Sequence, residues 1–319
     1  MRKFAALAVA LGVAAATAQA QPWPSKPIRL IVNFPPGGAA DQIARGVAPP
    51  LGEALGQPVV VENRPGANGN IGAEAVAKSP PDRYTLLMSS GGAFSVNPHL
   101  YTKLPFDPLK DLEPVAAAAR ILVFLVVKPD LPAKSVDEFV ALARANPRKL
   151  SYGSPGSGSS PHIATVMLAR AAGIQVVHIP YKGAAPALTD LLGGQLDFMF
   201  DPGIGLGQVR AGKLRLLAVG SPKRSPLFAD VPTVAETGIA GFDADSWFGF
   251  YSPAGLPADI ATRLNREINH AIQTPAVRDR ILAIGGEPVA MSAGEFAEVQ
   301  RKDRERFGAV IREAGIRLD

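Results

Sequence analysis

The 319-residue sequence contains no cysteine. Disulfide bonds, thiolate metal sites and thiol nucleophiles are therefore excluded, as is a lipid anchor attached to an N-terminal cysteine. Basic residues are not clustered either: no run of Lys or Arg is longer than two, although the formal net charge is +5. Charges of both signs are mixed within 301–306, Arg-Lys-Asp-Arg-Glu-Arg, which predicts a solvated helix face. We therefore expect no nucleic-acid partner.

Long apolar runs are absent after the first twenty residues. At the N-terminus, Arg2 and Lys3 precede an almost unbroken apolar stretch over 4–16, and Ala-Gln-Ala at 18–20 forms a small-x-small motif. This pattern is typical of a secretory signal peptide, here residues 1–20 with cleavage after Ala20. A short membrane anchor is the alternative, but the apolar stretch falls short of the roughly 20 residues that a span needs. We therefore expect an exported, periplasmic protein.

Short strand-like runs alternate with helical patterns along most of the remaining chain. Strands are expected over 28–33, 59–62, 85–89, 150–153, 176–179, 196–201 and 214–220, and helices over 41–55, 162–172 and 186–192. Such alternation predicts an α/β fold in which a mostly parallel sheet is covered by helices on both faces.

Two segments do not fit one continuous sheet. The run 120–127 is apolar for too long to be a half-buried strand, and 242–251 is aromatic and extended. We expect both to cross between two lobes, with lobe 1 formed by 21–123 plus 246–319 and lobe 2 by 124–245. Ser135 and Ser292 each begin a capping-box pattern that opens a helix.

Four loops follow strands, at the place where ligands of open α/β sheets bind. The first is 34–41, whose glycines and following helix N-terminus could receive an anion on backbone N–H groups. The second is 89–92, with two serines and two glycines. The third is the Gly- and Ser-rich segment 154–162, and the fourth combines 181–183 with Asp201 at a strand end. A tight turn without ligand, or a flexible linker for the third loop, is the alternative reading.

Enzyme motifs are missing from these loops. No Gly-x-Ser-x-Gly spacing surrounds Ser154 or Ser157, and no Lys follows the glycines as in a phosphate-binding loop. The four histidines have no paired metal-ligand spacing. A secreted hydrolase using Ser157, His162 and Asp201 stays open as an alternative, because spacing alone does not exclude that triad.

Across these loops the sequence resembles the Bug-type extracytoplasmic solute receptors of tripartite tricarboxylate transporters. The resemblance covers the chain after residue 20 in order. The matching segments are Trp23-Pro24, Phe34-Pro35-Pro36-Gly37-Gly38, Val60-Val61-Glu62-Asn63-Arg64-Pro65-Gly66, Tyr152-Gly153-Ser154, His178-Ile179-Pro180-Tyr181-Lys182-Gly183, Ala187-Leu188-Thr189-Asp190-Leu191-Leu192-Gly193-Gly194 and Asp230-Val231-Pro232-Thr233.

The resemblance implies a two-lobed, Venus-flytrap fold that closes over a small carboxylate by hinge movement, with no catalytic residue, metal or cofactor. It also implies delivery of the ligand to membrane transporter subunits by a monomer, although a receptor that presents its ligand to a membrane sensor kinase is an open alternative. A dicarboxylate, an amino acid or an aromatic carboxylate would each suit such a receptor. The implied ligand-binding residues are Phe34, Gly38, Ala39, Asp41, Ser89, Ser90, Gly91, Ser157, Gly158, Ser159, His162, Tyr181 and Asp201.

Overall fold

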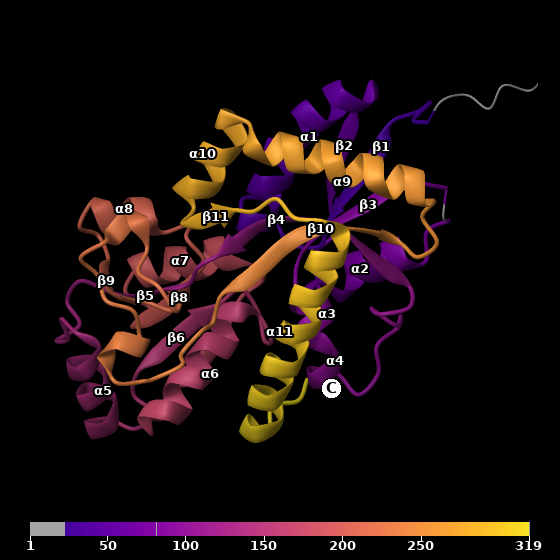
Figure 1. The fold of residues 1–319 in the computed structure, drawn as a ribbon. Coiled ribbons are helices and arrows are strands. Elements are labelled where there is room, and N and C mark those ends of the chain that lie inside the picture. Colours follow the sequence, from indigo (N-terminus) through magenta and orange to yellow (C-terminus); the bar gives the residue numbers. More distant parts are fainter. Residues whose placement is uncertain (1–22, 81, 319) are drawn as a thin grey trace, which may run out of the picture.

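The computed structural model describes residues 23–80 and 82–318, so the predicted signal peptide lies outside the described residues. Its strands form two separate sheets (Figure 1). The strands are β1 (Ile28–Val32), β2 (Val59–Asn63), β3 (Thr85–Ser90), β4 (Leu112–Ile121), β5 (Phe124–Val127), β6 (Ser151–Ser154), β7 (Val177–Pro180), β8 (Phe198–Asp201), β9 (Arg215–Val219), β10 (Ser246–Pro253) and β11 (Gly286–Pro288).

The larger sheet has six strands in the order β11-β4-β10-β3-β1-β2. Strands β2 and β3 both run parallel to β1, whereas β10 runs antiparallel to both β3 and β4. Strands from both ends of the sequence therefore interleave in this sheet. We call it, with its helices, lobe 1.

The smaller sheet has five strands in the order β7-β6-β8-β5-β9. Strand β6 pairs in parallel with β7 and β8, and only β5 runs against its neighbours. We call this sheet, with its helices, lobe 2. Two α/β sheets flanked by helices confirm the predicted fold class, whereas the lobe boundaries at 123/124 and 245/246 stay a prediction.

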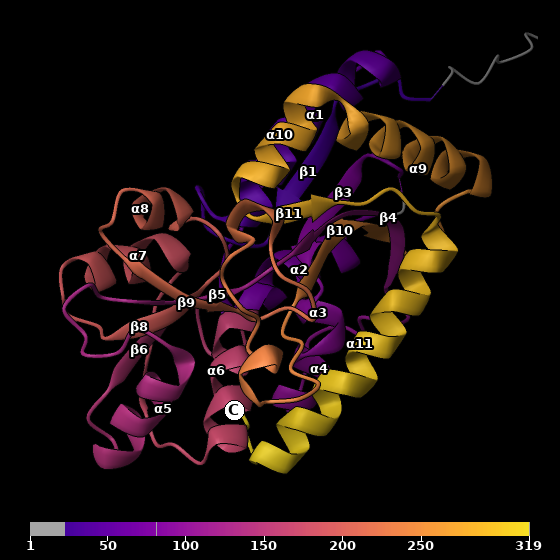
Figure 2. The same cartoon turned by 60° about the vertical axis from the view of Figure 1, so that its left-hand side comes forward.

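Helices cover both faces of each sheet (Figures 1 and 2). In lobe 1, α1, α9 and α10 bury one face and α2, α3 and α11 the other. In lobe 2, α5 and α6 lie on one face and α7 and α8 on the other. The helices are α1 (Ala39–Leu55), α2 (Asn70–Ala77), α3 (Gly92–Ser95), α4 (Asn97–Leu100), α5 (Val136–Ala145), α6 (Ser160–Ala172), α7 (Ala184–Leu192), α8 (Leu206–Arg210), α9 (Ala258–Gln273), α10 (Pro275–Ala283) and α11 (Ala293–Ala314).

The long last helix touches both lobes. Helix α11 packs on β4 and α3 in lobe 1 and contacts α6 in lobe 2, beside which it ends (Figures 1 and 2). Its start is a complete capping box between Ser292 and Glu295, as predicted. None of the helices within the described residues is long and apolar enough to span a bilayer.

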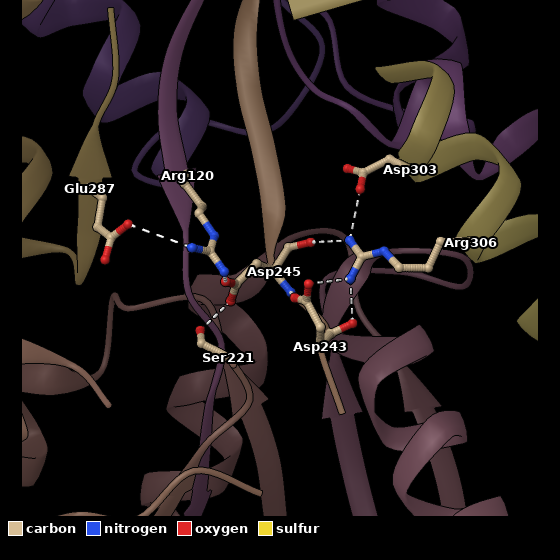
Figure 3. Close-up of polar contacts among 7 residues, drawn as sticks. All are labelled: Arg120, Ser221, Asp243, Asp245, Glu287, Asp303 and Arg306. Carbon is tan, nitrogen blue, oxygen red and sulfur yellow. Dashed lines mark hydrogen bonds and ion pairs between the residues drawn. The ribbon is translucent and has the colours of Figure 1, made fainter. Parts of the chain in front are cut away.

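The chain crosses between the sheets at two neighbouring places. Strand β4 ends at Ile121 and β5 begins at Phe124, so the expected crossing within 120–127 is confirmed. On the return, the regular strand begins only at Ser246, and the segment before it is held by side chains instead (Figure 3). Arg120 Nη2 lies 2.5 Å from Asp245 Oδ2, and Ser221 donates a hydrogen bond to Asp245 Oδ1.

Helix α11 completes this polar cluster with Arg306. Its guanidinium lies 2.9 Å from a carboxylate oxygen of Asp243 and 2.8 Å from one of Asp303, and it donates to the carbonyl oxygen of Asp243 at 2.6 Å (Figure 3). The prediction that 301–306 forms a solvated face is therefore wrong in part. Asp303 is 7% exposed and points with Arg306 toward the crossing segment, whereas Arg301 pairs with exposed glutamates.

Candidate ligand-binding cleft

One cleft is lined by the predicted loops of both lobes and has an empty volume of about 810 Å³, with the part that opens to solvent included. Its lining residues are Phe34, Pro35, Pro36, Gly38, Ala39, Ala40, Asn68, Ser90, Gly92, Ser95, Val96, Ser246, Phe248 and Phe307 from lobe 1, and Pro155, Gly158, Ser159, Ser160, Pro161, Gly183, Ala184, Ala185, Pro186 and Pro202 from lobe 2.

The first loop presents the start of α1 to the cleft. Gly38 is its N-cap residue, no side chain caps it, and the first helical hydrogen bond runs from Gln42 N to Gly38 O at 3.0 Å. The backbone N–H groups of Ala39 and Ala40 therefore precede the helical ladder and are available to a ligand. They also lie at the positive end of the dipole of a 17-residue helix.

Asp41 supports this loop from behind. Its carboxylate accepts hydrogen bonds from Gly37 N at 3.0 Å, Arg45 Nε at 2.9 Å and Asn63 Nδ2 at 2.9 Å. Burial alone would raise the pKa of Asp41, but these hydrogen bonds outweigh it and hold the pKa below its usual value. The carboxylate stays ionised, neutralises Arg45 and fixes the turn before α1.

The second loop continues β3. Ser90 lies opposite Phe248 in the pairing of β3 with β10, so both side chains point to the same face of the sheet and both line the cleft. Ser89 points elsewhere: it is fully buried, accepts a hydrogen bond from Asn33 and donates one to Ser90 O. Gly91 donates its N–H to Trp247 O at 2.6 Å, which fixes the loop against β10.

The third loop brings the start of α6 to the cleft and is ordered by internal hydrogen bonds. Ser159 Oγ donates to Gly156 O at 2.7 Å, and Gly158 N donates to His162 Nδ1 at 3.0 Å. Gly158 adopts a φ of +84°, and a Cβ there would overlap Leu100 of lobe 1. This close approach and the positive φ both require glycine.

Two stacked histidines underlie this loop. The rings of His162 and His178 are 4.2 Å apart, and His178 Nε2 lies 2.7 Å from Ser154 Oγ. Burial, together with the neighbouring His178, lowers the pKa of His162 to about 3, and burial lowers that of His178 to about 4. Both imidazoles are therefore neutral at physiological pH and act as hydrogen-bonding supports.

The fourth loop contributes the start of α7 at Gly183 and Ala184, while its predicted side chains lie outside the lining. Tyr181 donates its hydroxyl proton to Asp190 at 2.6 Å. Asp201 is fully buried and accepts N–H groups of Gly203 at 3.0 Å and Gly205 at 2.9 Å. Burial raises the pKa of Asp201 to about 7, because the two N–H bonds compensate only in part.

The predicted residues thus divide into two groups. The six that line the cleft are Phe34, Gly38, Ala39, Ser90, Gly158 and Ser159. The seven that lie outside its lining, most of them ordering the loops, are Asp41, Ser89, Gly91, Ser157, His162, Tyr181 and Asp201. For these seven, direct contact with a ligand stays a prediction.

Several lining residues escaped the sequence interpretation. Ser246 and Phe248 belong to the segment that was expected only to cross between lobes, and Phe307 lies on a helix interpreted as solvated. A period-2 pattern along β10 could have indicated that Ser246 and Phe248 share one face. No local sequence pattern predicts that Phe307 lines the cleft, because its position depends on how α11 packs against the rest of the protein.

The predicted hydrolase triad is not connected in this structure. Gly158 N donates to His162 Nδ1, and Gly203 and Gly205 donate to Oδ2 of Asp201. No hydrogen bond links Ser157, His162 and Asp201 within the described residues. No group of three metal-ligating side chains occurs among the described residues either. What the cleft offers is backbone: the starts of α1, α6 and α7, none capped by a side chain.

Comparison with known proteins agrees with this architecture. Residues 43–316 match the model of the family described as tripartite tricarboxylate transporter family receptor. The protein BugT of Bordetella pertussis is 40% identical over 307 residues, which cover 95% of this chain and 94% of BugT.

Two solved structures with bound ligands are also similar. Rpa4515 of R. palustris with adipate has a TM-score of 0.89 at 35% identity, covering 92% of this chain and 99% of that one. MatC of Rhodopseudomonas palustris with bound malate has a TM-score of 0.85 at 29% identity, covering 90% and 99%. The family match spans most of the chain and the relatives extend over nearly all of it, so this protein belongs to the tripartite tricarboxylate transporter family receptors, the Bug family of solute-binding proteins.

Proposed function

We propose that this protein is a periplasmic receptor that captures a small carboxylate in the cleft between its lobes and delivers it to a tripartite tricarboxylate-type transporter. The observation that carries the proposal is the convergence of three uncapped helix N-termini on one cleft whose described lining contains no charged side chain. Backbone N–H groups at helix starts bind anions without a cationic partner.

The first lobe supplies the anchor in this mechanism. The N–H groups of Ala39 and Ala40 receive the carboxylate, and hydrogen bonds of this charge-assisted kind contribute about 1.5–3 kcal/mol each. Asp41 holds the turn that aims them. The adipate of Rpa4515 and the malate of MatC support a carboxylate as the ligand class, since both relatives share the fold over nearly the whole chain.

The second lobe closes the site. Gly158 approaches Leu100 of lobe 1, and a Cβ on Gly183 would lie only 3.1 Å from Cγ of Pro35. The loops before α6 and α7 therefore approach lobe 1 closely, as expected of a clamp that closes over its ligand. Opening at the two neighbouring crossing segments releases the solute. Presentation to a sensor kinase would use the same capture step.

The test begins with a thermal-shift screen of carboxylates, adipate, malate and benzoate among them. A ligand at 100 times its dissociation constant stabilises the folded state by about 2.7 kcal/mol. Calorimetry then compares wild type with Gly38→Val. The valine fits locally, because φ of Gly38 is −75° and the nearest atom to a Cβ is Pro35 O at 3.6 Å, but its methyl groups crowd the amides of α1.

We expect Gly38→Val to weaken binding more than tenfold while leaving the melting temperature of the ligand-free protein within a few degrees of wild type. Gly294→Val is the matched control, because Gly294 lies in the first turn of α11 with open space around its Cβ. Native affinity in Gly38→Val would contradict the anchor. A screen in which no carboxylate shifts the melting temperature would contradict the proposal as a whole.

A further inference from the structure

The lining of the cleft differs between its two ends. Lobe 1 contributes both kinds of hydrogen-bond donor: Ala39 and Ala40 at the α1 end offer N–H groups, and Ser90 and Ser246 on its strands offer hydroxyls. Ser90 is 8% exposed and Ser246 is 6% exposed, and no described residue hydrogen-bonds either hydroxyl. Both residues line the cleft, so their hydroxyls can bond a ligand or water there.

Proline removes donors at the lobe 2 end. Pro161 is the second residue of α6 and Pro186 the third of α7, so each helix start presents one N–H group fewer than α1 does. Pro155 and Pro202, which flank these loops, have no N–H group either. Of the three polar side chains nearby, Ser159 donates to Gly156 O and Asn68 donates to Asn97, so among the described residues only the Ser160 hydroxyl is left without a protein partner.

Aromatic and aliphatic side chains fill the wall between the two ends. Phe248 is 7% exposed, Phe307 3% and Val96 3%, and Phe34 lies half-buried at the α1 end. Together with the prolines they surround the body of a ligand with hydrocarbon. Burial of apolar ligand surface against such walls is favourable. A second ionised group there gives up its hydration and meets no ionic partner, only the reduced set of N–H groups that α6 and α7 keep beside their prolines.

The described lining also contains no carboxylate that could pair with a cationic group on the ligand. Three carboxylates are adjacent in sequence to lining residues, those of Asp41, Asp201 and Asp245, and all three lie outside the lining. Asp41 is bonded to Gly37, Arg45 and Asn63, Asp201 to Gly203 and Gly205, and Asp245 to Arg120 and Ser221. An ammonium group on the ligand would therefore be unpaired, which disfavours amino acids.

We infer that the cleft is specific for monocarboxylates with an apolar body, aliphatic or aromatic, in preference to dicarboxylates and amino acids. This inference rests on the proposed function, because it takes the α1 end as the carboxylate anchor. It adds that the ligand carries one charge only and that the lobe 2 end receives hydrocarbon.

The experiment is a calorimetric titration of the ligand-free protein at pH 7.5 with two six-carbon probes, hexanoate and adipate, which differ only in the second carboxylate. Hexanamide, a neutral analogue of hexanoate, is the control for the anchor. We expect hexanoate to bind at least tenfold more tightly than adipate and hexanamide not to bind measurably. A second acid with an aromatic body, 3-phenylpropanoate, is expected to behave like hexanoate.

The possible results separate the two claims. Adipate binding as tightly as hexanoate, or more tightly, would overturn the inference while leaving a carboxylate receptor. Binding of hexanamide as tight as that of hexanoate, or no binding of any acid, would overturn the proposed function and the inference with it.

A substitution at the lobe 2 end provides an independent check. Ser160 lines the cleft at the start of α6 and is partly exposed, so a longer side chain is accommodated. Ser160→Lys adds a cation where a second carboxylate would lie and should raise the affinity for adipate relative to hexanoate at least fivefold over wild type. Ser160→Gln, long but neutral, should not. An unchanged ratio in Ser160→Lys would show that the distal end of the ligand lies elsewhere and would refute the inference.

Discussion

Replacing Asp201 by asparagine should flatten the pH dependence of the free energy of unfolding. Asp201 is fully buried at the end of β8, its Oδ2 accepts two backbone N–H groups, and its Oδ1 has no hydrogen-bond partner among the described residues. Burial raises its pKa from 3.8 to about 7. Since the folded state holds this proton more tightly than the unfolded chain, the carboxyl stabilises the fold at low pH, and the contribution is lost as pH rises through 7.

These pKa values set the size of the effect. Between pH 5 and pH 8, a carboxyl group with a pKa of 3.8 when unfolded and about 7 when folded loses about 2–3 kcal/mol of stabilisation. Asparagine imitates the protonated acid, because its oxygen still accepts from Gly203 and Gly205 while its amide nitrogen occupies the Oδ1 position. Asp201→Asn should therefore lack this loss.

Urea denaturation of the ligand-free protein at pH 5 and pH 8 measures the difference. Wild type should lose about 2–3 kcal/mol more between the two pH values than Asp201→Asn does. Asp279→Asn, at an exposed position of α10, is the control and should follow wild type. Equal losses in wild type and Asp201→Asn would refute the claim that this carboxyl is neutral in the folded state near pH 6.

Two further substitutions probe the crossing region and a close approach between the lobes. Arg306→Met leaves the Asp303 carboxylate buried without its ion-pair partner and should lower the free energy of unfolding by about 3 kcal/mol. Adding Asp303→Asn to the same chain should restore at least about 1 kcal/mol. Purely additive losses in a double-mutant cycle would contradict this coupling. Gly203→Ala should lower the melting temperature by more than 10 °C, because φ is +94° and the new Cβ would overlap the carbonyl oxygen of Ile284. Gly207→Ala in α8 is the control. Its new Cβ would have open space around it, so the melting temperature should be unchanged or slightly raised.

The sequence patterns predicted the elements well where local signals and burial agree. The β-branched run at 28–33 and the four-residue spacing of Ile260, Leu264, Ile268 and Ile272 correspond to β1 and to the buried face of α9. The Ser135 pattern is less regular than predicted. Its hydroxyl accepts from Glu138 N, but the Glu138 carboxylate accepts from Lys134 N, one residue before the expected partner.

The cleft was predictable in its loops but not in its walls. Glycine, serine and the position after a strand indicated the α1 and α6 loops from sequence alone, because these are properties of neighbouring residues. Phe307 and Arg306 have opposite roles one residue apart on α11, the first lining the cleft and the second holding the crossing segment. That division depends on how a helix from the end of the chain docks on distant strands, which no local pattern encodes.

The strand order of the larger sheet has a consequence for how the protein is made. Strand β10 lies between β3 and β4, so these two strands, complete within the first 121 residues, have no direct pairing with each other. Lobe 2, whose strands run without interruption from 124 to 219, can fold as soon as it is synthesised. The larger sheet must wait for residues after 245 to arrive. Until then, β3 and β4 each present an open edge of the kind that promotes aggregation.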